Sequence, residues 1–337
     1  MPVRLKDIAV ELGVSVVTVS KVLRNHSDIS LETRNRVLER MKQLNYRPNL
    51  AARALVTGKT NMIGFVVPDL LHPFFAEVAK GLTKILRKRG YCLVIASSEE
   101  DPELEKQEIE HLLARRVDAL IVASTQANAN SFAQAEEQKT PFVLIDRFFE
   151  GLSANFIGVD DEKAGYIATR HLIEQGCKRI AHIRGPQGSS ALGREMGYRH
   201  AVKEAGQEEI VVASASMDDQ ADARGYDAMN TLLELSPRPD GVFCFNDPNA
   251  IGALTALLDA GVKVPDEIAV IGVGNLHYAG LLRVPLSSVD QDSSALGEEA
   301  AKMAIRLIEA KITSRPKKVL LEPKLVIRTS TLRNAQK

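Results

Sequence analysis

The chain has 337 residues, of which 45% are hydrophobic and 26% are charged, a composition typical of a water-soluble globular protein. This length allows two or three domains with large cores, no apolar run is long enough to cross a membrane, and we expect no signal peptide at the start of the chain. The net charge of zero hides a basic start: residues 1–60 carry eleven Lys or Arg and five Asp or Glu, whereas the remainder carries 32 and 38. Such a basic segment on an acidic body favours contact with a polyanion.

The first stretch predicts two short helices joined by a turn. Apolar residues recur at helical spacing over residues 5–12, Gly13 allows the left-handed turn that ends this helix, and Ser15 is placed to cap a second helix. Two short helices joined in this way place the second one in the DNA major groove. An ordinary helical hairpin inside a larger core is the alternative. The residues expected to face inward are Leu5, Ile8, Ala9, Leu12, Val19, Val22 and Leu23.

A third helix is expected over residues 31–44, capped by Ser30. Its core stripe would be Val37, Leu38, Met41 and Leu44. A short helix follows over residues 49–56, built from small helix formers and one large residue, Leu55. A helix of this length does not hold in isolation, so it needs a symmetry mate or DNA as a partner.

From Met62 onward, apolar strands alternate with amphipathic helices, which indicates an α/β protein with parallel sheets covered on both faces. Nine strands in about 270 residues are too many for one core and suggest two lobes. The expected strands cover residues 62–67, 91–96, 119–123, 142–145, 156–159, 179–183, 210–213, 242–245 and 268–273. The expected helices cover residues 75–89, 103–115, 163–174, 194–205, 225–234, 248–259 and 294–309.

Polar and aromatic side chains follow many of these strands. The carboxyl ends of parallel strands form one rim, where ligands bind. Carboxylate, guanidinium and amide groups beside Phe rings suit a polyhydroxylated or nitrogen-rich small molecule. The alternative is that these residues only cap the helices that follow. The strand-end residues are Asp69, Phe74, Phe75, Ser124, Asp146, Arg147, Arg194, Asn246, Asp247 and Asn275.

The sequence contains no pattern typical of an enzyme. Thr57-Gly58-Lys59-Thr60 lacks the first Gly and the preceding strand of a phosphate-binding loop, and the seven His show no metal-binding spacing. Cys92, Cys177 and Cys244 are expected to be buried reduced thiols of a cytoplasmic protein. We therefore expect no catalytic residues, no metal and no cofactor.

Several motifs make the chain resemble the LacI/GalR family of transcription regulators. In the first 60 residues the similarity runs through residues 14–23, 30–34 and 44–55. In the body it continues through residues 63–64, 73–75, 117–122, 180–183, 185–186, 246–247 and 289–291. The resemblance implies an all-α helix-turn-helix head over residues 1–47 and a hinge helix with linker over residues 48–60. It also implies an α/β body over residues 61–337, like a periplasmic sugar-binding protein.

In that family the chain crosses between the lobes three times. The resemblance thus implies a first lobe of about 61–157 and 290–320 and a second of about 158–289 and 321–330. It implies a homodimer that binds a palindromic double-stranded DNA operator and is modulated by a small-molecule effector between the lobes, most simply as a repressor. The alternative is a cytoplasmic sugar-binding or sugar-processing protein with a helical interaction module.

By position, the family resemblance assigns base contacts to Val16, Val17 and Lys21, and a minor-groove wedge to Leu55. Val16 and Val17 cannot hydrogen-bond, so they can contact only thymine methyl groups or shape; either valine could instead be a packing residue. The full set of expected DNA-binding residues is Leu5, Lys6, Ser15, Val16, Val17, Thr18, Ser20, Lys21, Arg24, Ser30, Thr33, Tyr46, Asn49, Arg53 and Leu55.

The expected effector residues are set by the same resemblance. The family usually has Asp near position 274, where this chain has Gly274-Asn275, so the usual way of binding a monosaccharide is in doubt. The identity of the effector, and whether it induces or corepresses, are not encoded in a recognisable motif. The expected effector-binding residues are Phe74, Phe75, Ser124, Asp146, Arg147, Arg194, Met217, Asn246, Asp247 and Asn275.

Overall fold

Two compact units make up the chain, Met1–Thr60 and Asn61–Lys337. We call them the head and the body. The computed structural model describes residues 3–23, 26–46, 54, 58–125, 130–149, 152–186, 188–213, 221–310 and 315–333.

The described part of the head is a bundle of three helices, α1 (Leu5–Leu12), α2 (Val16–Leu23) and α3 (Leu31–Gln43). Gly13 ends α1 at φ +63°, as the turn requires, and its N–H donates back to Ala9 and Val10. The core consists of Ile8, Ala9, Val19, Val22, Val37 and Met41.

Two residues expected in that core are exposed. Leu23 lies at the last position of α2 and is 38% exposed, and Leu38 is 47% exposed because it lies at the edge of the buried stripe formed by Val37 and Met41. The expected helix over residues 49–56 lies outside the described residues, apart from Ala54.

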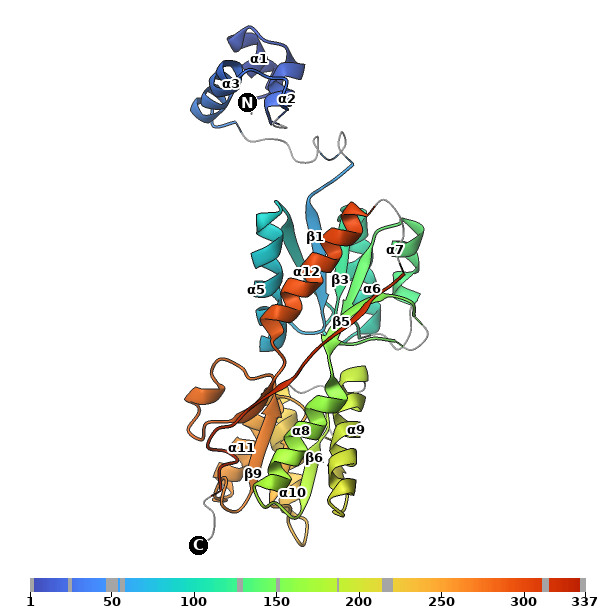
Figure 1. The fold of residues 1–337 in the computed structure, drawn as a ribbon, viewed down its shortest axis with the longest axis vertical. Helices are drawn as coiled ribbons and strands as arrows, with labels where there is room; N and C mark the ends of the chain where they lie inside the picture. The colour runs from blue at the N-terminus through green and yellow to red at the C-terminus, as the bar shows by residue number, and fades with distance from the viewer. Residues whose placement is uncertain are drawn as a thin grey trace. The chain divides into compact units, whose positions relative to one another are not determined.

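The body contains two six-stranded sheets, one in each lobe (Figure 1). Sheet one has the order β11-β5-β4-β3-β1-β2 and is parallel throughout. Its strands are β1 (Met62–Val67), β2 (Cys92–Ser97), β3 (Ala119–Val122), β4 (Phe142–Ile145), β5 (Asn155–Val159) and β11 (Lys318–Leu321).

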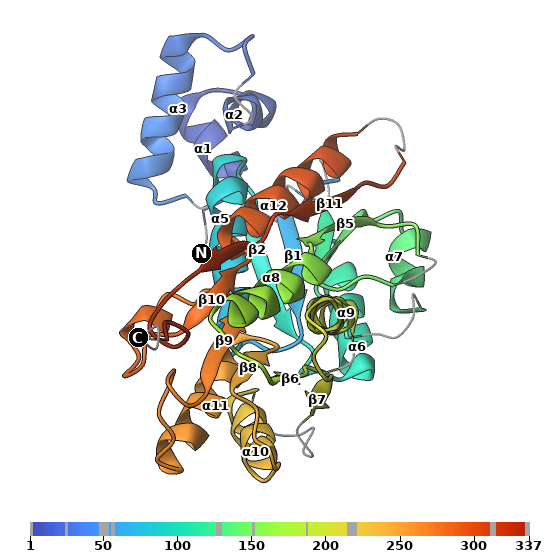
Figure 2. The ribbon, with the colours of Figure 1, turned by 60° about the horizontal axis from the view of Figure 1, so that its bottom comes forward.

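Sheet two has the order β12-β10-β9-β8-β6-β7, which can be followed from β10 to β7 in Figure 2. Only β12 runs antiparallel to its neighbour. The strands are β6 (Ile180–Ile183), β7 (Ile210–Val212), β8 (Gly241–Cys244), β9 (Ala269–Val273), β10 (Ser287–Asp290) and β12 (Lys324–Val326).

Helices cover both faces of each sheet, which explains why the central strands are continuous apolar runs. In lobe one, α5 (Pro73–Lys88) and α12 (Ser293–Glu309) cover one face, and α6 (Pro102–Ala114), α7 (Ala133–Glu137) and the 3-10 turn η1 (Asn130–Phe132) cover the other. In lobe two, α8 (Asp161–Glu174) and α9 (Ser189–Glu204) cover one face of the sheet, and α10 (Ala221–Leu233) and α11 (Asp247–Asp259) cover the other. A second 3-10 turn, η2 (Ala279–Leu281), precedes β10.

The chain passes between the lobes three times within the described body. It leaves sheet one after β5 and enters α8, returns after β10 to form α12 against α5, and passes from β11 to β12 (Figure 1). Each lobe is therefore assembled from separate parts of the sequence.

All nine strands expected from the sequence are present, but three more were not anticipated. The strands β10, β11 and β12 have only three or four residues, and Ser287 and Ser288 make β10 polar, so none forms a clear apolar run. Helix α9 begins at Ser189, five residues earlier than expected, and Cys92 is exposed on the edge strand β2 rather than buried.

Helices α5 and α12 pack closely because each has a glycine at the contact. A Cβ atom on Gly297 would lie 2.2 Å from the carbonyl oxygen of Val78, and one on Gly81 would lie 2.1 Å from that of Ser294. No residue with a side chain fits at either position without moving the two helices apart.

We predict that Gly297→Ala destabilises the body, because the added methyl group meets backbone that cannot yield. Overpacking of this kind costs about 1–3 kcal/mol. The loss is measured as the decrease in the free energy of unfolding in urea. Glu299→Ala on the exposed side of the same helix is the control, and its free energy of unfolding should stay within about 0.5 kcal/mol of the parent's. Equal stability of Gly297→Ala and the parent would contradict the close packing.

Candidate functional site

The second helix of the head presents its amino-terminal end to solvent. Ser15 accepts a hydrogen bond from the Thr18 N–H at 3.0 Å, which fixes the start of α2. Val16 and Val17 are 42% and 60% exposed, although large apolar residues gain from burial. Exposed valines at the start of a capped helix fit a surface that meets a partner.

Lys21 has a partner within the head. Its Nζ contacts the Asp28 carboxylate at 2.5 Å, and the hydrogen bond from Lys21 holds the pKa of Asp28 below its usual value. A base contact by Lys21 would have to replace this ion pair. Ser30 caps α3 by accepting from the Thr33 N–H, so these two expected DNA-binding residues also have a structural role.

The other expected DNA-binding residues differ in environment. Lys6 is exposed, Thr18 and Ser20 are half-buried, and Leu5 and Tyr46 pack against the head core. Arg24, Asn49, Arg53 and Leu55 lie outside the described residues. The DNA-binding role of the whole set stays a prediction.

A cavity of about 630 Å³ lies between the two lobes of the body. The carboxyl ends of both sheets open onto it, as expected for ligand sites in parallel sheets. Six of the expected effector residues line it: Phe74, Phe75, Asp146, Arg147, Arg194 and Asn246.

In lobe one, Glu100 and Arg147 form a two-pronged ion pair on the wall of the cavity. Both guanidinium N–H groups donate to the carboxylate at 2.9 Å. Burial favours a raised pKa for Glu100, but the hydrogen bonds and the positive charge of Arg147, together with the charge of Arg224, leave the pKa lowered. Glu99, Glu100 and Asp146 all have positive φ, between +49° and +61°, and such strain in non-glycine residues concentrates at functional sites.

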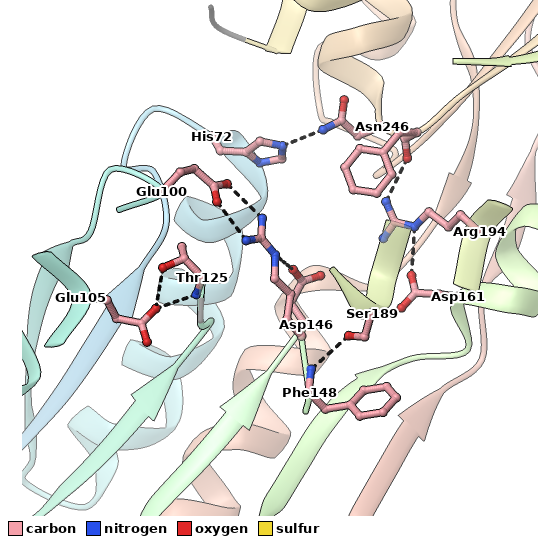
Figure 3. A network of polar contacts seen from close by, with 12 residues as sticks. His72, Glu100, Glu105, Thr125, Asp146, Phe148, Asp161, Ser189, Arg194 and Asn246 are labelled. Carbon is pink, nitrogen blue, oxygen red and sulfur yellow. Dashed lines mark hydrogen bonds and ion pairs between the residues drawn. The ribbon is translucent and has the colours of Figure 1, made fainter. Parts of the chain in front are cut away.

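In lobe two, Arg194 is buried and three contacts hold its guanidinium group, of which Figure 3 labels the one with Asp161. It donates to Asp161 and to the Phe245 carbonyl, both at 2.9 Å, and lies 4.7 Å from the centre of the Phe245 ring. Burial raises the pKa of Asp161, and the charge of Arg194 opposes that rise. A cation so fixed offers its remaining donors to a ligand in one orientation.

His72 and Asn246 connect the two lobes across the cavity (Figure 3). The His72 Nε2 lies 3.0 Å from the Asn246 amide nitrogen, and the Asn246 amide oxygen accepts from the Asn249 N–H at 2.9 Å. The ring therefore accepts at Nε2, and the longer 3.3 Å contact of Nδ1 with the Phe74 N–H is not a hydrogen bond in that tautomer. A protonated imidazole could not accept this bond. Burial lowers the pKa of His72 to about 4, so the ring is neutral at pH 7.

Ser124 lies behind the cavity wall rather than on it. Its hydroxyl donates to the buried Glu105 carboxylate at 2.6 Å, and Glu105 also accepts from the N–H and the hydroxyl of Thr125 at 2.6 and 3.0 Å. Burial raises the pKa of Glu105, and these three bonds lower it in part. Thr125 lines the cavity in place of Ser124.

Asp247 and Asn275 also lie outside the lining. Asp247 accepts from the Leu276 N–H and the Ser288 hydroxyl, and burial raises its pKa to about 6. Asn275 bonds to Asp290 and Arg328. Gly274 does line the cavity, with φ +134° and a carboxylate oxygen of Asp247 3.5 Å from the place of a Cβ atom. A residue with a side chain would be strained there, and an Asp would add a second carboxylate beside Asp247.

Sequence reasoning missed several residues of the cavity. Glu100 and Thr125 follow strands, so a stricter use of the strand-end rule could have found them. His72 precedes α5 and Arg224 lies inside α10, and no local pattern points to either. Met217 lies outside the described residues. The further lining residues are Asp69, Leu71, His72, Glu99, Glu100, Thr125, Pro186, Arg224, Phe245, Pro248, Val273, Gly274, Leu276 and Gln291.

Two kinds of site are not found in the part of the chain that the structure covers. No group of three His, Cys, Asp or Glu side chains is placed to hold a metal ion among these residues. None of their helices has both the length and the apolar character needed to cross a bilayer.

A helix-turn-helix head and a two-lobed body with a cavity between parallel sheets together define a ligand-responsive DNA-binding regulator. The family model for bacterial regulatory proteins of the lacI family matches residues 4–49. The model for periplasmic binding proteins and the sugar binding domain of the LacI family matches residues 60–329. The chain therefore belongs to the LacI family, and it is a transcriptional regulator with an effector-binding body.

Relatives of this chain are similar over nearly its whole length. The HTH-type transcriptional repressor PurR of Histophilus somni is 34% identical, over 97% of this chain and 98% of the relative. The ribose operon repressor of Halalkalibacterium halodurans is 32% identical, over 97% and 96%. The crystal structure of the lac repressor dimer bound to operator and the anti-inducer ONPF has a TM-score of 0.85 at 26% identity, covering 98% of this chain and all of that one.

We predict that His72→Gln removes a pH-dependent part of the stability. The folded protein binds fewer protons than the unfolded chain between pH 4 and 6.5, so neutral His72 favours folding above pH 6.5, and this contribution falls as the pH drops towards 4. The free energy of unfolding of the parent minus that of His72→Gln should therefore fall by about 3 kcal/mol between pH 7 and 4.

Subtracting the free energy of unfolding of His72→Gln from that of the parent removes the contribution of the other titrating groups, which both proteins share. His182 has a pKa lowered to about 4 by burial and acts in the same direction, whereas the raised pKa of Asp247 acts in the opposite one. A difference that stays constant over this pH range would show that His72 is not held neutral in the cavity.

Proposed function

We propose that this chain is a homodimeric repressor that binds a palindromic operator through its heads and that a small-molecule effector in the cavity between the lobes modulates this binding. The observation that carries the proposal is one polar cavity with walls from both lobes in a chain whose head is a helix-turn-helix. A ligand that touches both walls binds the closed and open arrangements of the lobes with different affinity, which is what a change of state requires.

The effector is, in our proposal, a sugar or a related polar metabolite that carries little net charge. Four carboxylates and three guanidinium groups line the cavity, so their charges nearly cancel. Phe74, Phe75 and Phe245 supply ring faces, while carboxylates and guanidinium groups supply pairs of hydrogen-bonding atoms for hydroxyls. The family description names a sugar binding domain, and one relative is a ribose operon repressor.

A dimer is supported by apolar surface on the body. Leu281 is 83% exposed, and Ile95 is 43% exposed on the edge strand β2. Exposed large side chains and an unpaired sheet edge are typical of surfaces that a second subunit covers. The lac repressor, which is similar over the whole chain, is described as a dimer on its operator.

We further propose that the cavity binds its ligand without transforming it and that the protein works where the DNA is, in the cytoplasm. The relatives carry the names of repressors, and the three described cysteines are free thiols. Recovery of a bound ligand unchanged after incubation tests the first statement, and conversion of the ligand would favour a sugar-processing protein.

DNA binding is tested by selecting a site for the full chain from random duplexes and comparing the parent with Leu55→Ala. We expect a two-fold-symmetric site, with affinity that falls steeply as salt rises because phosphate contacts release counterions. Loss of the Leu55 wedge should weaken binding to this site far more than binding to unrelated DNA.

The same experiment has two outcomes against the proposal. Failure to select any symmetric site would overturn operator binding. Equal weakening on both DNAs would leave operator binding intact and remove the wedge role of Leu55.

Effector binding is tested by a thermal-shift screen of sugars and nucleosides against the parent and Asp146→Asn. A ligand at about 100 times its Kd stabilises the body by about 2.7 kcal/mol and raises the Tm. Asn tolerates the positive φ of position 146, so the variant should fold, yet it lacks the charge that ligand hydroxyls bind.

We expect the ligand-induced shift to be lost in Asp146→Asn, while the Tm without ligand stays close to the parent's. Asp222→Asn, an exposed residue outside the cavity lining, is the control and should keep the shift. An undiminished shift in Asp146→Asn would place the ligand elsewhere.

A further inference from the structure

The amino ends of the strands in lobe one form a basic edge. We define the amino-end rim of a lobe as the last four residues of each helix together with the residues that lead from it to the next strand. Because sheet one is parallel throughout, all its strand starts meet at one rim, opposite the effector cavity. Among the described residues, this rim carries nine Lys or Arg and four Asp or Glu.

The basic residues extend across the whole rim. They occupy positions 87–89 before β2, 115–116 before β3, 139 before β4, and 306, 315 and 317 before β11, and all nine are exposed. With neighbouring strands about 4.8 Å apart, six strands place the outer ones about 24 Å apart. A row of this length can meet several phosphates of a DNA duplex.

Lobe two shows that the architecture alone does not produce this charge. Helices end at the amino ends of parallel strands, and their dipoles favour cations there. The same effect acts in lobe two, yet its described amino-end rim, including the segment from η2 to β10 and the one after the antiparallel β12, carries eight Lys or Arg against nine Asp or Glu. The basic charge belongs to lobe one specifically.

The cations of lobe two also have nearby carboxylates. Arg179 pairs with Glu208, and Arg333 lies 3.4 Å from Asp240. On lobe one, Arg89 likewise lies 3.4 Å from Glu309, while the exposed Lys88, Lys139 and Lys317 come from three different segments of the rim. An excess of positive charge on an otherwise acidic body is costly through self-repulsion unless a polyanion meets it.

Lobe one is the lobe that follows the head in the chain. Residues 47–60 join the two, and fourteen residues reach about 50 Å at most. DNA held by the head is thus kept at high effective concentration near this rim.

We propose that the amino-end rim of lobe one is a second phosphate-binding surface, which contacts the backbone of DNA flanking the operator irrespective of its sequence. The proposal rests on the proposed function, since the head must bring DNA to the rim. Lysine and arginine side chains meeting phosphates supply affinity and no base readout.

The test compares the full chain with the triple variant Lys88→Gln, Lys139→Gln and Lys317→Gln. Each protein is titrated, at several salt concentrations, with the selected operator on a short duplex and on one extended by about two helical turns on each side. On the long duplex, the slope of log affinity against log salt should become shallower by about 0.9 for each lost phosphate contact. On the short duplex the two proteins should be much closer to each other.

The matched control removes three exposed lysines from the corresponding rim of lobe two, in Lys178→Gln, Lys203→Gln and Lys263→Gln, and should keep the parent's slope. Arg at the three lobe-one positions should restore it. An unchanged slope for the lobe-one variant on the long duplex, or an equal loss in the lobe-two control, would overturn the proposal. A parent that binds no operator at all would instead overturn the proposed function.

Discussion

In the body, the carboxyl ends of the strands in sheet one face the carboxyl ends of the strands in sheet two, and the rest of the body depends on this arrangement. Each lobe needs strands from both sides of the sequence, so the chain passes between the lobes three times and holds the two edges face to face. Polar groups that are far apart in the sequence thereby share one cavity, and His72 in lobe one bonds to Asn246 in lobe two at 3.0 Å. Any ligand that enters between them acts on both lobes.

Much of the fold could be predicted because buried parallel strands are long apolar runs. All nine apolar runs recognised in the sequence are strands in the structure, and for β4 the predicted range is also the observed one. The three missed strands owe their place to pairing partners rather than to their own composition, and Ser287 in β10 illustrates this by bonding to residues 328, 330 and 331. Such tertiary contacts leave no local period in a sequence.

The site was predictable from local sequence where the chemistry lies at a strand end, whereas Phe74, Phe75 and Arg194 lie in helices and were assigned by the family resemblance. Asp146 and Arg147 follow β4 directly and line the cavity, as expected. Ser124 also follows a strand, but the sequence does not show that Glu105, nineteen residues earlier, holds its hydroxyl. His72 and Arg224 reach the cavity through the packing of whole helices, which no spacing rule describes.

The head, the cavity and lobe one differ in their distribution of charge. The head carries exposed apolar and basic groups around a capped helix, the positive and negative charges that line the cavity nearly cancel, and lobe one is basic at the edge opposite the cavity.

The coupling between ligand binding in the cavity and DNA binding is a free energy, so each ligand changes the affinity for the other by the same factor. The most direct test of the account is therefore the operator affinity of the full chain with and without a saturating ligand found by thermal shift. We predict a change of about 5- to 150-fold, and an operator affinity unaffected by a ligand that occupies the cavity would contradict it.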